Sequence, residues 1–109
     1  MSRLAVARNY ADTLLTLADR TDGAEAWLAL IDEVAALYRD VPAFRAFLET
    51  PRVSLADKRQ VIEEVFGDRC PESFVRFLLV LLENRRQGLL PEIEAEAREL
   101  LNERTGKVR

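Results

Sequence analysis

The most apolar segment of this chain reads Phe-Val-Arg-Phe-Leu-Leu-Val-Leu-Leu-Glu-Asn-Arg-Arg, residues 74–86. When the segment is placed on a helix at about 100° per residue, Arg76 and Glu83 form one narrow polar strip and apolar side chains occupy nearly all the remaining circumference. A helix that is apolar on all sides has to be buried on all sides. The segment is therefore either the central helix of the fold or a helix whose surplus apolar surface another protein covers.

The size and composition of the chain indicate one ordinary globular domain. Its 109 residues are enough for one core that buries roughly 60–70% of the unfolded surface. Apolar residues make up 49% of the chain, which is too many for a disordered protein. The net charge of −3 gives no reason to expect nucleic acid as the main partner, and no apolar run is long enough for membrane insertion.

The residues needed for common catalytic and metal sites are missing from this sequence. There is no histidine, and a single cysteine, Cys70, can form no internal disulfide. Catalytic triads and common zinc sites need histidine or several cysteines, and the few glycines form no phosphate-binding cluster. We therefore expect no catalytic residue, no metal site and no cofactor.

Glycine, proline and capping residues divide the chain into helices, and no segment alternates like a strand. The predicted fold class is all-α, a compact six-helix bundle in a single domain. The six predicted helices run near Leu4 to Arg20, from Ala24 to Arg39, from Pro42 to just before Thr50-Pro51, from Ser54 to Phe66, from Pro71-Glu72 to Gln87-Gly88, and from Leu89 or Pro91 to Arg104. The last of these has one apolar stripe and a face of glutamates, which is typical of a surface helix.

The first helix also has more apolar surface than a core stripe of about 100° requires. If its alanines and Leu14 point to the core, then Val6, Tyr10, Thr13 and Leu17 form an additional flank. Two such helices lying side by side would form a groove for an amphipathic partner helix. The alternative is a broad contact within the core.

Several motifs resemble, in order and spacing, the N-terminal domain of the delta subunit of F-type ATP synthase, the bacterial relative of mitochondrial OSCP. Arg8-Asn9-Tyr10-Ala11-Asp12-Thr13-Leu14 resembles the family's Arg-x-Tyr-Ala-x-Ala-Leu signature, with Thr13 in place of the usual alanine. The segment from Phe77 to Arg86, followed by Leu89-Leu90, resembles its most recognisable stretch. Further matches are found at Leu48, Pro51, Val53, Lys58, Ile93, Leu100, Asn102-Glu103 and Gly106.

The resemblance implies a non-catalytic part of the peripheral stalk, or stator, that sits on the catalytic head. It implies that the first and fifth helices bind the N-terminal helix of an alpha subunit and so hold the head against rotor torque. It also implies a peripheral location in the ATP synthase complex, on the cytoplasmic face of the bacterial plasma membrane. The predicted partner-binding residues are Val6, Tyr10, Thr13, Leu14, Leu17, Arg76, Phe77, Val80 and Asn84.

The family continues into a C-terminal domain that contacts the b subunits, whereas this sequence stops at Lys107-Val108-Arg109. We therefore expect residues 1–109 to be the N-terminal helical domain alone, without contacts to the b subunits. Two other functions are compatible with the pattern. A small helical RNA-binding bundle of the antitermination type would need a basic face, and a self-associating bundle would use the same apolar strip.

Overall fold

The computed structural model describes residues 2–106, and their regular structure is helical, which confirms the predicted all-α class. Its elements are α1 (Arg3–Asp19), α2 (Ala24–Asp40), α3 (Pro42–Glu49), α4 (Leu55–Phe66), α5 (Glu72–Glu83), a 3-10 turn η1 (Gln87–Leu89) and α6 (Leu90–Arg104). The predicted helix starts agree with these bounds to within one or two residues. Local signals mark them: the Ser54 hydroxyl accepts a hydrogen bond from the Asp57 N–H at the start of α4, and Pro42 occupies the first turn of α3.

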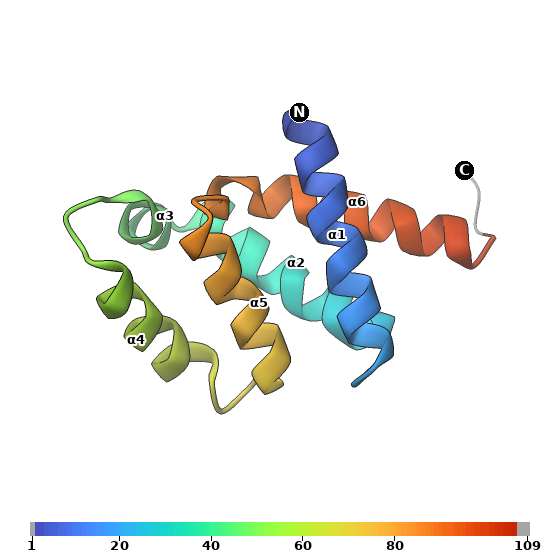
Figure 1. The fold of residues 1–109 in the computed structure, drawn as a ribbon, viewed down its shortest axis with the longest axis horizontal. Helices are drawn as coiled ribbons and strands as arrows, with labels where there is room; N and C mark the ends of the chain where they lie inside the picture. Colours follow the sequence, from blue (N-terminus) through green and yellow to red (C-terminus); the bar gives the residue numbers. More distant parts are fainter. Residues whose placement is uncertain (1, 107–109) are drawn as a thin grey trace.

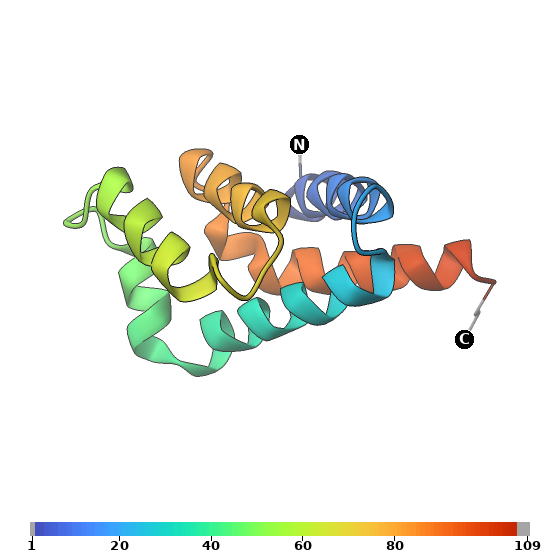
Figure 2. The same ribbon diagram turned by 90° about the horizontal axis from the view of Figure 1, so that it is seen from below.

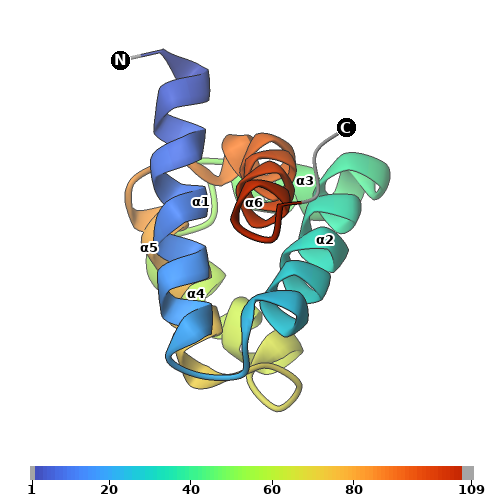
Figure 3. The same ribbon diagram turned by 90° about the vertical axis from the view of Figure 1, so that its right-hand side faces the viewer.

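The helices form an outer row of α4, α5 and α1, beneath which α6 and α2 cross (Figure 1; Figure 2). Viewed along the long axis, α6 lies between α1 and α2 (Figure 3), and it packs mainly against these two helices. The helix that resembles a surface helix in sequence is therefore the central one. Ile93 and Ala97 of its apolar stripe are fully buried, whereas Leu100 and Leu101 further along are half-buried.

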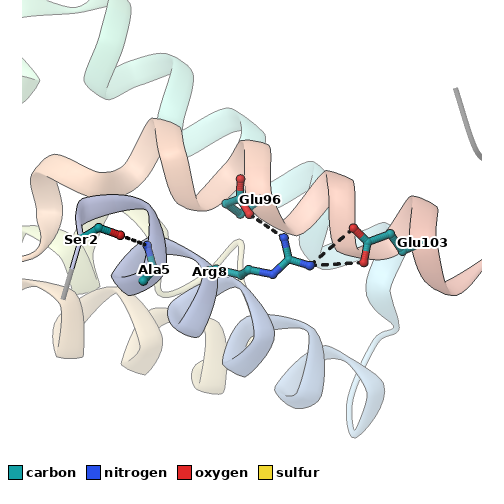
Figure 4. A network of polar contacts seen from close by, with 5 residues as sticks. All are labelled: Ser2, Ala5, Arg8, Glu96 and Glu103. Carbon is teal, nitrogen blue, oxygen red and sulfur yellow. Dashed lines mark hydrogen bonds and ion pairs between the residues drawn. The ribbon is translucent and has the colours of Figure 1, made fainter.

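The glutamates of α6 are compatible with this central position because arginines of neighbouring helices pair with them. The Arg8 guanidinium on α1 donates to Glu96 at 3.1 Å and to Glu103 at 3.3 Å (Figure 4). At the far end of the same two helices, Arg104 pairs with Asp19 at 2.6 Å. These pairs line the contact between α1 and α6, so the glutamate face is only partly a solvent face.

The core is one continuous cluster of apolar side chains from all six helices. Trp27 of α2 is fully buried, and its ring meets that of Phe74 of α5 edge to face with centroids 5.3 Å apart. Three fully buried alanines, Ala7, Ala11 and Ala18, lie on the core side of α1, and side chains this small let helices approach closely. The core thus holds α1 and α5 in fixed positions from below.

The fifth helix ends earlier than predicted, at Glu83 rather than near Gln87-Gly88. Arg85 adopts the left-handed conformation, with φ of 57°. Its N–H donates to the Leu82 carbonyl at 3.1 Å, and the Arg86 N–H donates to the Leu81 carbonyl at 2.8 Å. These two bonds form a Schellman motif, in which the left-handed position usually holds glycine. The helix stops here although its sequence contains no glycine or proline at this point.

The position of α5 excludes the reading in which the bundle encloses this helix on all sides. Although α5 packs on α4, α1 and the core, it belongs to the outer row and is not enclosed on all sides (Figure 2). Val80 in its middle is 37% exposed, whereas Phe74 at its start is fully buried. Part of the apolar circumference of α5 therefore remains on the surface.

Candidate functional site

The candidate site is the surface where α1 and α5 lie side by side and run in opposite directions (Figure 1). We call this surface the α1–α5 face and define it by Val6, Tyr10, Thr13 and Leu17 of α1, Arg76, Phe77 and Val80 of α5, and Asn84 at the end of α5. The fold thus brings together on one face residues of α1 and α5 that are 59 to 78 positions apart in the sequence.

Tyr10 connects the two helices at the middle of this face. Its ring meets the Phe77 ring edge to face, with centroids 6.3 Å apart and an interplanar angle of 78°. Its hydroxyl oxygen accepts a hydrogen bond of 2.9 Å from the Asn84 side-chain amide. Tyr10 therefore bridges the two helices at this point, and we call the apolar surface that it forms with Phe77 the floor of the α1–α5 face.

The remaining predicted residues differ in how far they reach the surface. Val80 is exposed, Val6 and Leu17 are half-buried, and the Thr13 hydroxyl is exposed and donates to the Asn9 carbonyl at 3.1 Å. Phe77 is 4% exposed and supports Tyr10 from below. These side chains give the centre of the α1–α5 face an apolar character.

Leu14 is a correction to the predicted set. It is fully buried and belongs to the core, so it offers no surface to a partner. Helical periodicity placed Leu14 on the core side of α1, and it entered the predicted set only through the resemblance to the family motif. The structure agrees with the periodicity.

The charged groups of this region lie at its edges and are paired within the molecule. Arg76 pairs with Glu72 one turn earlier on α5 at 3.1 Å, and Glu83 pairs with Arg59 of α4 at 2.6 Å. At the end of the face where α1 stops and α5 begins, a hollow of about 400 Å³ opens. It is lined by Thr21, Asp22, Pro71, Glu72, Ser73 and Arg76.

Sequence reasoning did not single out Leu79, which is half-buried next to Val80. With Val75 it lines a second hollow, of about 350 Å³, between α5 and α4. A signal was available, because Leu79 falls on the same side of α5 as Glu72, Arg76 and Glu83. Residues that share a helix face with charged groups tend to reach the surface.

The chemistry of the described residues gives no indication of catalysis. Burial raises the pKa of the Cys70 thiol, which keeps it in its unreactive protonated form. Among residues 2–106 no group of three histidine, cysteine, aspartate or glutamate side chains is arranged to hold a metal ion. Within the same residues, every helix is too short or too polar to span a lipid bilayer.

Comparison with known proteins agrees with the motifs on α1 and α5. Residues 6–109 match the family described as "ATP synthase delta (OSCP) subunit". The chain is 46% identical over 105 residues to the ATP synthase subunit delta of Gemmatimonas aurantiaca, an alignment that covers 95% of this chain and 56% of the relative. It is 33% identical over 111 residues to the subunit of the same name from Chlorobium luteolum, covering 99% of this chain and 60% of the relative.

A third relative, the ATP synthase subunit delta of Desulforamulus reducens, is 31% identical over 108 residues, with 99% of this chain and 60% of the relative covered. The chain thus spans a little more than half the length of the relatives that it matches. The matched residues include all of α5 and the part of α1 from Val6 onwards. The chain belongs to the ATP synthase delta (OSCP) subunit family.

Proposed function

We propose that this chain is a non-catalytic stator component of F-type ATP synthase, corresponding to the N-terminal domain of the delta subunit. Its α1–α5 face binds the N-terminal helix of an alpha subunit and holds the catalytic head against rotor torque. The chain then works peripherally in the complex, on the cytoplasmic face of the bacterial plasma membrane. Contacts to the b subunits belong to a second domain, outside these residues.

The observation that carries the proposal is the surplus apolar surface of two neighbouring helices. Val80 is 37% exposed in the middle of α5, and Val6, Tyr10 and Leu17 are half-buried beside it on α1. No charged side chain interrupts the centre of the described face, because Arg76 and Glu83 pair at its edges. An amphipathic helix that laid its apolar side across this floor would cover these four residues together.

A tether under torque needs slow dissociation more than fast association, and contact that excludes water is what slows dissociation. The floor formed by Tyr10 and Phe77 is suited to this task, because it is held in place by the Asn84 hydrogen bond and by the core beneath. A preorganised floor loses little conformational entropy on binding. We therefore expect Tyr10 and Val80 to carry a large share of the binding free energy.

The test uses a fluorescently labelled peptide of the alpha subunit's N-terminal segment. The chain is added in increasing amounts, and the anisotropy of the peptide is measured at each step. Tyr10→Ala and Val80→Ala should each weaken binding by about 1–2 kcal/mol, the usual cost of truncating an anchor residue. Val65→Ala is a matched control, because Val65 on α4 is likewise an exposed valine, at 45% exposure, but lies off this face. It should bind like the wild type.

Circular dichroism has to show that each variant remains folded, since Tyr10 also packs on Phe77. A folded Val80→Ala variant with unchanged affinity would remove the α1–α5 face as the binding site. The same conclusion follows if Val65→Ala loses as much affinity as Val80→Ala.

The RNA-binding alternative needs a continuous basic face and an affinity that falls steeply with salt. In residues 2–106, the arginines of α1 and α6 are instead largely engaged by carboxylates, as in the pairs of Arg8 with Glu96 and of Arg104 with Asp19. This arrangement favours a protein partner over a nucleic acid.

A further inference from the structure

The hollow between α4 and α5 is a surface that the proposed function leaves unused. We infer that it is a second docking surface and that its occupant is a basic amphipathic helix of another protein chain. Lysines or arginines of that helix bind Glu63 and Asp68, and its apolar side covers Leu79. This second contact does not depend on which partner occupies the α1–α5 face.

The hollow lies in the outer row of helices, where α4 and α5 are side by side (Figure 1; Figure 2). It has a volume of about 350 Å³. Its side chains come from both helices and from the loop between them, and they include Glu63, Asp68, Glu72, Val75, Arg76 and Leu79. The α1–α5 face lies on the other flank of α5, so one helix can bind on each flank.

The bottom of the hollow is apolar. Val75 is buried, and Leu79 is half-buried, so Leu79 presents apolar surface that α4 does not cover. Lysine and arginine bury their aliphatic stems along surface of this kind and keep their charged ends at its edge. The bottom of the hollow therefore suits the apolar side of a partner helix and the stems of its basic residues.

The rim of the hollow has negative charge that the described part of the chain does not compensate. Glu63 and Asp68 are exposed, and neither has an ion pair or a side-chain hydrogen bond among residues 2–106. The arginines closest to them in the sequence, Arg59 and Arg69, pair instead with carboxylates outside the hollow. Exposed carboxylates in this state are available to cationic side chains of a partner.

The position of Glu63 is unfavourable for the fold itself. It lies in the last turn of α4, which contains no basic residue, and a carboxylate there is repelled by the negative end of the helix dipole. Glu72 is the opposite case, because it lies in the first turn of α5, where a carboxylate is favourable, and Arg76 pairs with it at 3.1 Å. The fold thus accounts for Glu72 but not for Glu63. Residues that break a local rule in this way are typical of functional surfaces.

The shape and charge of the hollow favour a protein helix as the occupant. Among residues 2–106 no three carboxylate, histidine or cysteine side chains are arranged to hold a metal ion, and a negative rim repels nucleic acid. An amphipathic helix laid between two neighbouring helices presents its apolar side chains to the bottom of the hollow. Its basic residues then lie above the rim.

The experiment measures binding of a labelled model peptide to the 109-residue chain. The peptide is a helix of about 15 residues with leucine on one side and lysine on the other. A second peptide has the same composition in scrambled order, and therefore the same charge without an apolar side. The helical peptide should bind at about 20 mM salt and lose most of its affinity at about 0.5 M salt. The scrambled peptide should bind at least about tenfold more weakly, because it cannot bury leucine on Leu79.

Glu63→Gln/Asp68→Asn removes both uncompensated charges from the rim. It should weaken binding of the helical peptide about four- to twentyfold, since each exposed ion pair contributes about two- to fivefold. Asp12→Asn/Glu25→Gln is the matched control, because it removes two exposed carboxylates of α1 and α2 that lie outside the hollow. Its affinity should fall by less than about twofold. Val80→Ala should bind the model peptide like the wild type.

The inference is overturned if the wild type does not bind the helical peptide, if the scrambled peptide binds as tightly, or if the two double variants lose affinity equally. It is also overturned if the wild type sediments as a dimer that Glu63→Gln/Asp68→Asn dissociates, because the hollow then belongs to a second copy of the chain. Circular dichroism should show that Glu63→Gln has an unchanged or higher Tm. None of these results affects the proposed function, which is tested by the alpha-subunit peptide and Val80→Ala.

Discussion

Replacing Arg85 by glycine should stabilise this protein, although most substitutions destabilise. Arg85 occupies the left-handed position of the Schellman motif that ends α5, with φ of 57°. A side chain with a Cβ is strained in this conformation by roughly 1–2 kcal/mol, whereas glycine adopts it freely. The exposed Arg85 side chain makes no hydrogen bond or ion pair with residues 2–106, so its removal should cost little.

Glycine also increases the entropy of the unfolded chain, which offsets roughly 0.5–1 kcal/mol of this gain. We therefore expect Arg85→Gly to raise the free energy of unfolding by about 0.5–1 kcal/mol. For a domain of this size, that corresponds to a rise in Tm of about 2–5 °C. Thermal and urea unfolding followed by circular dichroism measure both quantities.

Arg85→Ala is the control, because alanine removes the guanidinium but keeps the Cβ and therefore the strain. Its stability should stay close to that of the wild type. If Arg85→Gly is no more stable than Arg85→Ala, the left-handed backbone carries no cost here and the reasoning is wrong. Neither variant should change the affinity for the alpha-subunit peptide, since Arg85 lines a hollow near α3 and α4.

Two further predictions concern polar groups that bond to the end of α3. Burial and the hydrogen bond that Tyr38 donates to Glu49 raise the pKa of Tyr38 from 10.0 to about 12. As the pH rises, the unfolded chain therefore loses this proton before the folded chain does. The free energy of unfolding should fall between about pH 10 and 12 as a result. Urea titrations across this range should show a shallower fall for Tyr38→Phe, and an identical fall would contradict the assignment. Lys58, only 8% exposed, donates from Nζ to the Leu48 carbonyl at the end of α3, at 2.9 Å. Lys58→Met should lower the free energy of unfolding, measured in urea, by about 1–2 kcal/mol because it removes this buried hydrogen bond. Arg59→Met is the control and should lower it by less than about 1 kcal/mol, because the ion pair of Arg59 with Glu83 is exposed.

The sequence predicted the α1–α5 face in part. Tyr10, Val80 and Asn84 follow from the surplus apolar width of two helices and from the family motifs, and the structure places them on one face. Leu14 was assigned to the face and lies in the core, whereas Leu79 was overlooked and reaches the surface. Leu14 was assigned through the family motif although its helical position pointed to the core, and Leu79 shares a side of α5 with charged residues such as Arg76.

The sequence by itself determined the helices, most of their ends and the stripe that each turns to the core, because these properties depend on residues within about one helical turn of each other. Only the tertiary structure decided that α6 is central, that α5 keeps an exposed side, and that Tyr10 and Asn84 bridge two helices. It also decided that α5 ends at Glu83, although the residues that follow, Asn84-Arg85-Arg86, include no glycine or proline. These features depend on which helices become neighbours, and that choice minimises the exposed apolar surface of the whole chain, not of any one segment.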